Sequence, residues 1–177
     1  MLLPEKFVAP TELKDLYKKT VKDLQFKEAE QLYTNVDHKT EFNSIQTQAF
    51  SKIYHSDESV FLGAPSGSDL LTCIELAIFR ELQSEHGGKI LYIAPNDILC
   101  RNVYENWRYR LGSSSKSDDS LGLSICIFDH TGGNFVQQSQ EIAKADIIMS
   151  TPAVWETISR RWRQRKVLHQ ITLCIFD

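Results

Sequence analysis

The chain has 177 residues, which fits one domain and is too short for two ordinary ones. Hydrophobic residues make up 42% of it and charged residues 24%, which is enough apolar material for a packed core and excludes global disorder. The net charge is −3, from 20 Lys and Arg against 23 Asp and Glu, so the chain is not a strongly basic nucleic-acid binder, although a local basic patch remains possible. No apolar run reaches the roughly 18 residues of a membrane span. The start of the chain, MLLPEKFVAP, lacks the pattern of a secretory signal.

Residues 1–41 differ in composition from the rest. They hold two prolines, seven Lys and eight acidic residues, with few apolar positions. We interpret them as a surface-packed arm with one short amphipathic helix. This arm leads into a single domain over residues 42–177.

Helical and strand patterns alternate after Phe42. Asn43 and Gln46 have the spacing of a capping box that opens a helix, and Thr151 followed by Pro152 predicts another helix start. Further helices are predicted over 70–82, 96–111 and about 135–144, and strands over 59–64, 89–95, 123–129, 146–151 and 171–177. Five apolar strands that alternate with helices predict an α/β fold with a parallel sheet covered on both faces.

Apolar faces support two of these helices. Leu99, Val103, Trp107 and Leu111 lie on one side of the helix over 96–111, and Trp155, Ile158 and Trp162 continue the helix that starts at Pro152. Ligands of parallel sheets bind at the carboxyl ends of the strands, so the residues that follow each strand are the candidates for function. The chain stops at Asp177, on a strand expected to be buried, and we therefore expect it to be a fragment of a longer protein.

The four cysteines show no metal or disulfide pattern. Cys73, Cys100, Cys126 and Cys174 form no C-x-x-C pair, and no His stands at metal-ligand spacing from any of them. Two of them lie in apolar runs. Buried, reduced thiols of a cytosolic or nuclear protein are favoured over a disulfide or a zinc site, and no metal site is predicted.

The segment GAPSGSDLL (63–71) joins a predicted strand to a helix, where a phosphate-binding loop belongs. The generic pattern G-x-x-x-x-G-K-[ST] falls on Ala64, Asp69, Leu70 and Leu71, and all four positions depart from it. Leu70 removes the cation that would face the phosphates, and Leu71 removes the hydroxyl that would hold a metal. Asp69 adds a negative charge that repels a phosphate by about 4 kcal/mol at 4 Å and an effective dielectric constant near 20.

Asp69 also has a structural interpretation. Aspartate is a good N-cap, so its carboxylate could cap the helix and fill the anion site while Leu70 and Leu71 pack inward. The loop is then a relic that does not bind ATP productively. The alternative is a divergent loop that still works.

Several segments together resemble superfamily 2 helicases. They are FNSIQTQAF (42–50), VFLGAPSGS (60–68), YIAP (92–95), STP (150–152) with Trp155, and ISRRWRQR (158–165). Within this superfamily the chain resembles the two-cassette DExH RNA helicases of the spliceosomal snRNP type, from about Leu3 through Asp177. The resemblance implies the first RecA-like (P-loop NTPase) domain of a C-terminal cassette, cut off at the DExH-box strand.

The resemblance also implies site residues. The nucleotide-binding positions, in degenerate form, are Phe42, Gln46, Ala64, Pro65, Ser66, Gly67, Ser68, Asp69, Leu70 and Leu71. The candidates for RNA contact are Pro95, Arg101, Thr131, Gly132, Ser150, Thr151 and Pro152. Asp177 matches the first residue of the DExH box, the metal-linked catalytic aspartate, here a relic.

Departures from the family at two RNA-facing turns point in the same direction as those in the loop. Where the family has small and basic residues after Pro95, this chain has Asn96, Asp97 and Ile98. Where the family usually has Glu-Lys after Pro152, this chain has Ala153 and Val154. The resemblance therefore implies a pseudo-helicase cassette that binds neither ATP nor Mg²⁺ productively. It implies a regulatory and protein-binding role in pre-mRNA splicing in the nucleus. The implied partners are splicing-factor proteins and an active N-terminal cassette, with weak RNA contact and no membrane.

Simpler interpretations of three features stay open. Gln46 can be only half of a capping box, and Ser150 and Thr151 can serve only to start a helix. The basic residues over 160–166 can grip phosphates or form a solvated or partner-binding helix face. For the chain as a whole, three alternatives remain: an active RNA-stimulated ATPase with an unusual loop, the second cassette of a cointegrator-complex type of helicase, and a protein-interaction domain without RNA contact.

Overall fold

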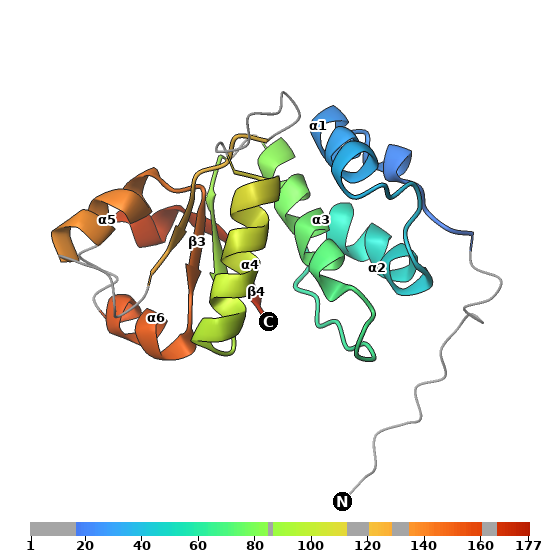
Figure 1. Cartoon of the computed structure of the whole chain (residues 1–177). Helices are drawn as coiled ribbons and strands as arrows, with labels where there is room; N and C mark the ends of the chain where they lie inside the picture. The colour runs from blue at the N-terminus through green and yellow to red at the C-terminus, as the bar shows by residue number, and fades with distance from the viewer. Residues whose placement is uncertain (1–16, 85–86, 113–120, 129–134, 161–165) are drawn as a thin grey trace, which may run out of the picture.

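A parallel sheet with helices on both faces forms the body of the molecule (Figure 1). The computed structural model describes residues 17–84, 87–112, 121–128, 135–160 and 166–177. Its sheet has the order β2-β3-β1-β4, and every pair of neighbouring strands is parallel. The strands are β1 (Lys89–Ile93), β2 (Ile125–Ile127), β3 (Ile147–Ser150) and β4 (Ile171–Phe176). The predicted parallel α/β fold is confirmed.

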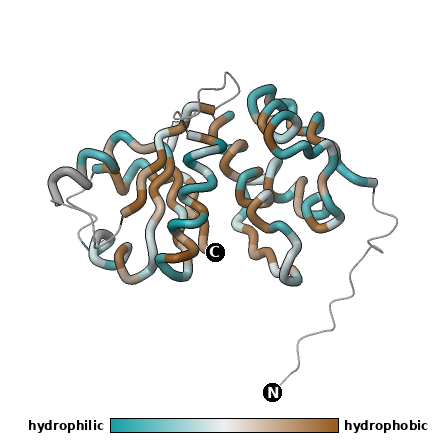
Figure 2. The backbone as a smooth tube through the Cα atoms, viewed as in Figure 1, coloured by the Kyte–Doolittle hydropathy of each residue, from teal (hydrophilic) through white to brown (hydrophobic). Residues whose placement is uncertain are grey.

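Side chains alternate between the two faces of the sheet, as the pleat of a strand requires. In β1, Ile90 and Tyr92 belong to a cluster with α3 (Leu70–Gln83) and α4 (Asp97–Arg110). Leu91 and Ile93 belong to a second cluster with α5 (Phe135–Lys144) and α6 (Pro152–Ser159). All four side chains are at most 4% exposed, as expected for the interior strand of a three-layer fold. The strands are apolar, whereas α4 and α5 carry more hydrophilic residues (Figure 2).

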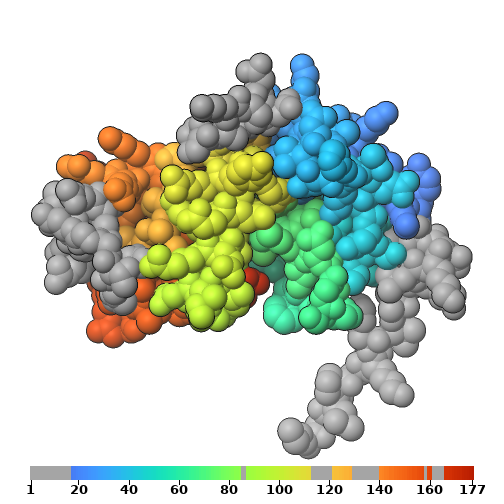
Figure 3. All heavy atoms as spheres, in the orientation of Figure 1, coloured from blue at the N-terminus to red at the C-terminus, as the bar shows by residue number. Residues whose placement is uncertain are grey.

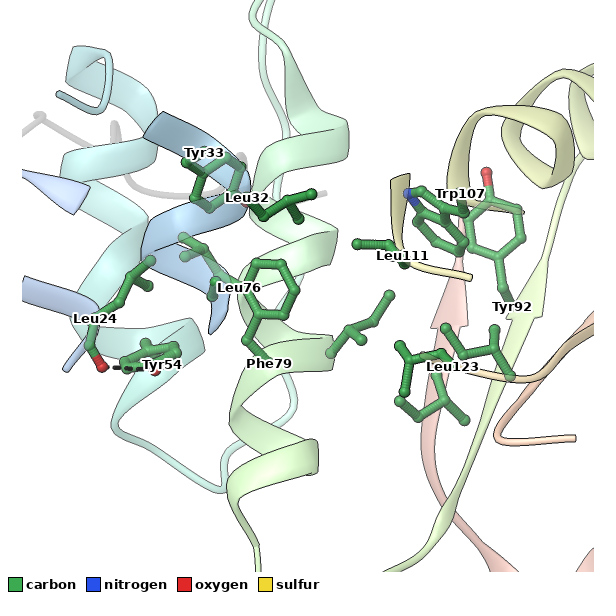
Figure 4. Packing of buried hydrophobic residues seen from close by; sticks show 14 of the residues in the cluster. Leu24, Leu32, Tyr33, Tyr54, Leu76, Phe79, Tyr92, Trp107, Leu111 and Leu123 are labelled. Carbon is green, nitrogen blue, oxygen red and sulfur yellow. Dashed lines mark hydrogen bonds between the residues drawn. The ribbon is translucent and has the colours of Figure 1, made fainter. Parts of the chain in front are cut away.

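The segment before residue 42 packs more deeply than a surface arm. It forms η1 (Val21–Leu24), α1 (Lys27–Gln31) and the π-helical turn η2 (Leu32–Val36). Leu24, Leu32 and Tyr33 are at most 1% exposed and join the cluster around α3 (Figure 4). We expected one short helix on the surface, and the structure has three short helical segments that contribute to the core. The domain division at residue 41 stays a prediction.

The strand predicted over 59–64 is wrong. These residues have no strand structure, and the side chain of Phe61 is 98% exposed. The loop that follows is held by α2 (Ser44–Tyr54) instead of the sheet, since Asn43 Nδ2 donates to Ser68 O at 3.0 Å. β4 is therefore an edge strand of the described sheet, and Thr172, Cys174 and Phe176 are exposed.

The predicted helix starts are confirmed. Asn43 and Gln46 form the capping box of α2, Asn96 Oδ1 accepts the amide of Leu99 at 2.9 Å, and α6 begins at Pro152. The apolar face expected on the helix over 96–111 is only partly buried. Trp107 is fully buried, but Leu99 in the first turn is 43% exposed. The first turn of α4 follows the carboxyl end of β1, at the edge of the described sheet.

Two further expectations have mixed outcomes. The cysteines were expected to be buried thiols, and this is confirmed for Cys73 and Cys100 but not for Cys126, which is half-buried, or Cys174, which is exposed. Cys174 is exposed because it lies on the edge strand β4. In the helix that starts at Pro152, Trp155 packs on the sheet, whereas the Ile158 side chain and Trp162 lie outside the described residues.

Candidate functional site

The loop over residues 63–69 directly precedes α3 and contains the predicted nucleotide-binding residues from Ala64 to Asp69. It lies at the edge of the molecule where the carboxyl ends of the strands and the first turn of α4 also lie (Figure 1). Ser68 N donates to Pro65 O at 3.2 Å, and Gly67 has a φ of 84°, which closes a tight turn. Gln46 Nε2 donates to Asp69 O at 3.0 Å. The loop is thus fixed to α2 at its C-terminal end.

Asp69 has an unusual backbone conformation, and one oxygen of its carboxylate accepts several hydrogen bonds. Its φ is 54°, in the left-handed region that glycine adopts most easily. Its Oδ2 accepts hydrogen bonds from Gln46 Nε2 at 3.0 Å, Lys39 Nζ at 3.0 Å and Thr72 Oγ1 at 2.8 Å. Asp69 stands at the N-cap position of α3, as predicted, but the side chain makes no bond to a backbone amide of the helix. The capping role expected of the carboxylate is therefore wrong, because side-chain donors use it instead.

These contacts determine the protonation of the carboxylate. Burial alone would raise the pKa of Asp69, but the hydrogen bonds from Thr72 and Lys39, the charge of Lys39 and the hydrogen bond from Gln46 outweigh it. The net effect lowers the pKa of Asp69 below its ordinary value. The group is therefore a carboxylate anion at neutral pH.

Leu70 and Leu71 provide neither a cation nor a hydroxyl. Both are half-buried, and Leu71 packs against the core cluster around α3. The next residue, Thr72, does carry a hydroxyl, but this group donates to Asp69 Oδ2 and accepts from Lys39 Nζ at 3.0 Å. The loop therefore ends in a carboxylate that is bonded to side-chain donors of the chain itself, and its place in a phosphate site stays a prediction.

The aromatic and amide residues at the start of α2 lie in the interior. The ring of Phe42 is 1% exposed and packs against Tyr33 and Phe50, with centroids 5.9 and 5.6 Å apart. Gln46 is fully buried, bonds with Asn43 in the capping box and turns its Nε2 toward Asp69. Gln46 thus has both a capping role and a contact to the loop. Its adenine contact stays a prediction.

The predicted RNA-contacting residues have different environments. Pro95 and Arg101 are exposed. Ser150 is buried and its Oγ donates to Phe128 O at 3.2 Å, so this side chain faces inward. Thr151 is 7% exposed, and Pro152 is the first residue of α6. Thr131 and Gly132 lie outside the described residues.

Asp177 is bound to the neighbouring strand β1. Its backbone N donates to Ile93 O at 3.0 Å, and its Oδ2 accepts from Tyr92 Oη at 2.6 Å. Burial first and then the Asp177 carboxylate raise the pKa of Tyr92 far above its ordinary value, so the phenol stays protonated and donates. The C-terminal end of the chain, in red, reaches the surface between α4 and the green segment that begins α3 (Figure 3). Asp177 is therefore held at the same edge as the loop.

The sequence analysis missed two residues of this region. Lys39 follows η2 and belongs to no motif, so nothing in the sequence singled it out. Glu75 did carry a signal, since it is a lone acidic residue on the apolar face of α3, and it is 1% exposed. Among the described residues, no cluster of three His, Cys, Asp or Glu side chains is arranged to hold a metal ion. No helix in the described part of the chain has the length and apolarity to span a membrane.

The parallel sheet, the helices on both faces and the glycine-containing loop that leads into α3 define a RecA-like domain of the P-loop class. The profile of the DEAD/DEAH box helicases matches residues 43–177. The chain belongs to this family, and its relatives place it with the DExH helicases of superfamily 2, as the sequence motifs indicated.

The similar proteins are large helicases. The chain is 38% identical over its whole length to the U5 small nuclear ribonucleoprotein 200 kDa helicase of Homo sapiens, of which it covers 8%. It is 37% identical to activating signal cointegrator 1 complex subunit 3 of Homo sapiens, of which it covers 7%. It is 35% identical to the DExH-box ATP-dependent RNA helicase DExH13 of Arabidopsis thaliana, of which it covers 8%. The chain therefore spans less than a tenth of these relatives.

A solved structure supports the fold. The crystal structure of the DUF1998 helicase MrfA bound to DNA and AMPPNP superimposes with a TM-score of 0.62. The match covers 83% of this chain and 20% of that protein, at 13% sequence identity. At this identity the likeness concerns the fold alone.

Proposed function

We propose that this chain is the first RecA-like domain of the C-terminal cassette of a two-cassette DExH RNA helicase, and that it does not bind ATP productively. Its role is that of a regulatory, protein-binding scaffold for an active N-terminal cassette. The similarity to the U5 small nuclear ribonucleoprotein helicase supports a role in pre-mRNA splicing, splicing-factor partners and a nuclear location.

The engaged carboxylate of Asp69 carries this proposal. Its Oδ2 occupies the donors of Lys39, Gln46 and Thr72 and neutralises the charge of Lys39, and a lysine at position 70 that would attract a phosphate is absent. Leu71 in addition offers no oxygen to Mg²⁺.

Residues at the carboxyl edge of the sheet support the proposal that any RNA contact is weak. Asp97 stands in the first turn of α4, where a carboxylate repels a phosphate backbone. Ile98 beside it is an apolar side chain that is 74% exposed. Val154 in α6 is only 3% exposed and offers no group to RNA. Exposed apolar and acidic side chains at this edge suit a protein partner better than a nucleic acid.

Photo-crosslinking tests the proposal on the full-length protein that contains this chain. The protein is irradiated with an azido analogue of ATP and Mg²⁺, and the labelled peptides are mapped by mass spectrometry. We expect label in an active N-terminal cassette and none on the peptides that hold Gln46 and Asp69. Label on those peptides that excess ATP prevents would overturn the proposal and favour an active ATPase.

A second candidate rests on the similarity to the cointegrator complex subunit, which is nearly as high as that to the U5 helicase. In that case the chain belongs to the second cassette of a cointegrator-complex type of helicase. Purification of the full-length protein separates the two, since it brings down either U5 components or cointegrator subunits.

A further inference from the structure

We propose that Lys39, Gln46 and Thr72 form a cage for a phosphate oxyanion, and that Asp69 is a tethered ligand that fills it. This inference rests on the proposed function, because it explains how the nucleotide loop is kept empty. The side chain of Asp69 alone then closes the site. Lys39 supplies the cation that Leu70 lacks, from a different element.

Three donors converge on one oxygen atom. Lys39 Nζ, Gln46 Nε2 and Thr72 Oγ1 all lie within 3.0 Å of Asp69 Oδ2. An ammonium group, an amide and a hydroxyl around one anionic oxygen are the groups that bind phosphate oxygens in proteins. They come from three separate elements, the turn after η2, α2 and α3.

The donors are held by contacts that do not involve Asp69. Lys39 N donates to Tyr33 O at 2.8 Å, and Lys39 Nζ lies 5.7 Å from the ring centroids of both Tyr33 and Phe42. Gln46 is fixed by its two capping-box bonds to Asn43. Removal of the Asp69 carboxylate should therefore leave the Lys39 and Gln46 donors in place.

Exposure and charge favour exchange of the ligand. The side chain of Lys39 is 20% exposed and that of Asp69 is 52% exposed, so the carboxylate is on the solvent side of the ammonium group. Lys39 and Asp69 together contribute no net charge. Without Asp69 the three donors keep a net charge of +1, which attracts an anion from solution.

Inorganic pyrophosphate, titrated calorimetrically into the 177-residue chain at low salt, tests the cage. Asp69→Gly is the variant of choice, because glycine adopts the left-handed φ of this position without strain. We expect no saturable binding by the unaltered chain up to about 10 mM and a dissociation constant on the order of 1 mM for Asp69→Gly. The double variant Lys39→Met/Asp69→Gly should bind at least about tenfold more weakly.

Asp57→Gly is the matched control. It also removes one negative charge, from an ion pair with Arg80 in which Asp57 is 98% exposed, but it leaves the cage filled. We expect it to remain unable to bind pyrophosphate. Equal binding by Asp57→Gly and Asp69→Gly would mean that net charge alone attracts the anion, and would overturn the cage.

Failure of the inference can be distinguished from failure of the proposed function. Mg-ATP binding by the unaltered chain contradicts the proposed function. If the unaltered chain binds neither Mg-ATP nor pyrophosphate and the folded Asp69→Gly chain does not bind pyrophosphate either, the cage is overturned and the proposed function is not. If the glycine variant does not fold by circular dichroism, Asp69→Ala replaces it, since it also removes the side chain from the cage, and the same outcomes decide.

Discussion

Arg110, in the last turn of α4, donates hydrogen bonds to both carboxylate oxygens of Glu75 at the centre of α3. Glu75 is 1% exposed and also accepts from Tyr33 Oη at 2.9 Å and Trp107 Nε1 at 3.1 Å. Arg110 in turn pairs with Asp37, just after η2. One buried carboxylate thus links the N-terminal segment, α3 and α4.

Removal of the Arg110 charge should destabilise the fold strongly. Arg110→Met leaves Glu75 buried without its cation, and breaking a buried ion pair in this way typically costs about 3–5 kcal/mol. We expect a loss near about 3 kcal/mol in urea unfolding, because Tyr33 and Trp107 still donate to the carboxylate.

Arg160→Met is the control for this prediction. Arg160 pairs with Glu156 at 2.6 Å on the surface of α6, and both side chains are more than 60% exposed. Such a solvent-exposed pair contributes little to stability, so we expect almost no change in the free energy of unfolding. Equal losses in the free energy of unfolding for Arg110→Met and Arg160→Met would show that the buried ion pair of Arg110 and Glu75 contributes no more than a surface pair, which contradicts the prediction.

The Asp69 contacts should stabilise the fold in a pH-dependent way. Folding lowers the pKa of Asp69 below its ordinary value of 3.8, so its stabilisation is present above pH 3.8 and is lost as the pH falls through the lowered value. Asp69→Asn should therefore be less stable than the unaltered chain at about pH 5 to 7, by less than about 1 kcal/mol given the exposure of the pair. Urea unfolding should show a smaller difference at about pH 3. A difference that grows toward low pH would contradict the contacts.

Two phenylalanines test the loss of the strand over 59–64. Phe61 is 98% exposed, whereas Phe79 in α3 is fully buried. Phe61→Ala should change the free energy of unfolding by less than about 0.5 kcal/mol, and Phe79→Ala should reduce it by about 3–5 kcal/mol. A loss above about 2 kcal/mol for Phe61→Ala would mean that this segment is packed as a strand.

The cysteines should differ in reactivity toward a thiol reagent such as DTNB. Cys174 is exposed, although partial burial also raises its pKa, whereas Cys73 is buried with its pKa raised to about 11, and burial raises the pKa of Cys126 to about 12. The native chain should therefore react fast at one thiol only, and Cys174→Ser should abolish this phase. Rapid reaction of a second thiol in the Cys174→Ser chain would contradict the described packing.

Periodicity and capping signals predicted most of the fold. The helices over α2, α3, α4 and α5 and the strands β1 to β4 were expected within a few residues, because their apolar patterns match the burial that the sheet requires. The run over 59–64 misled the analysis, since a short apolar run does not show whether a sheet edge is available to it. The buried Leu24 and Tyr33 were underestimated because the charged residues around them dominate the composition of their segment.

The candidate site was predictable only in part. The loop and its departures were visible in the sequence, and the acidic residue at its end is the centre of the observed contacts. The role of Lys39 was not predictable, because it depends on a turn after η2 that brings residues 30 positions apart into contact. Local sequence carries no signal for such a contact.

Urea unfolding of the chain with and without 1 mM Mg-ATP tests the central claim most directly. A ligand at 100 times its dissociation constant stabilises the folded state by about 2.7 kcal/mol, so a working loop of about 10 μM affinity would be detected at once. The variant Asp69→Gly/Leu70→Lys/Leu71→Thr restores the generic motif and serves as the positive control. We predict no change in the free energy of unfolding for the unaltered chain. Stabilisation of the unaltered chain by about 2 kcal/mol or more would contradict the account and identify a functional nucleotide site.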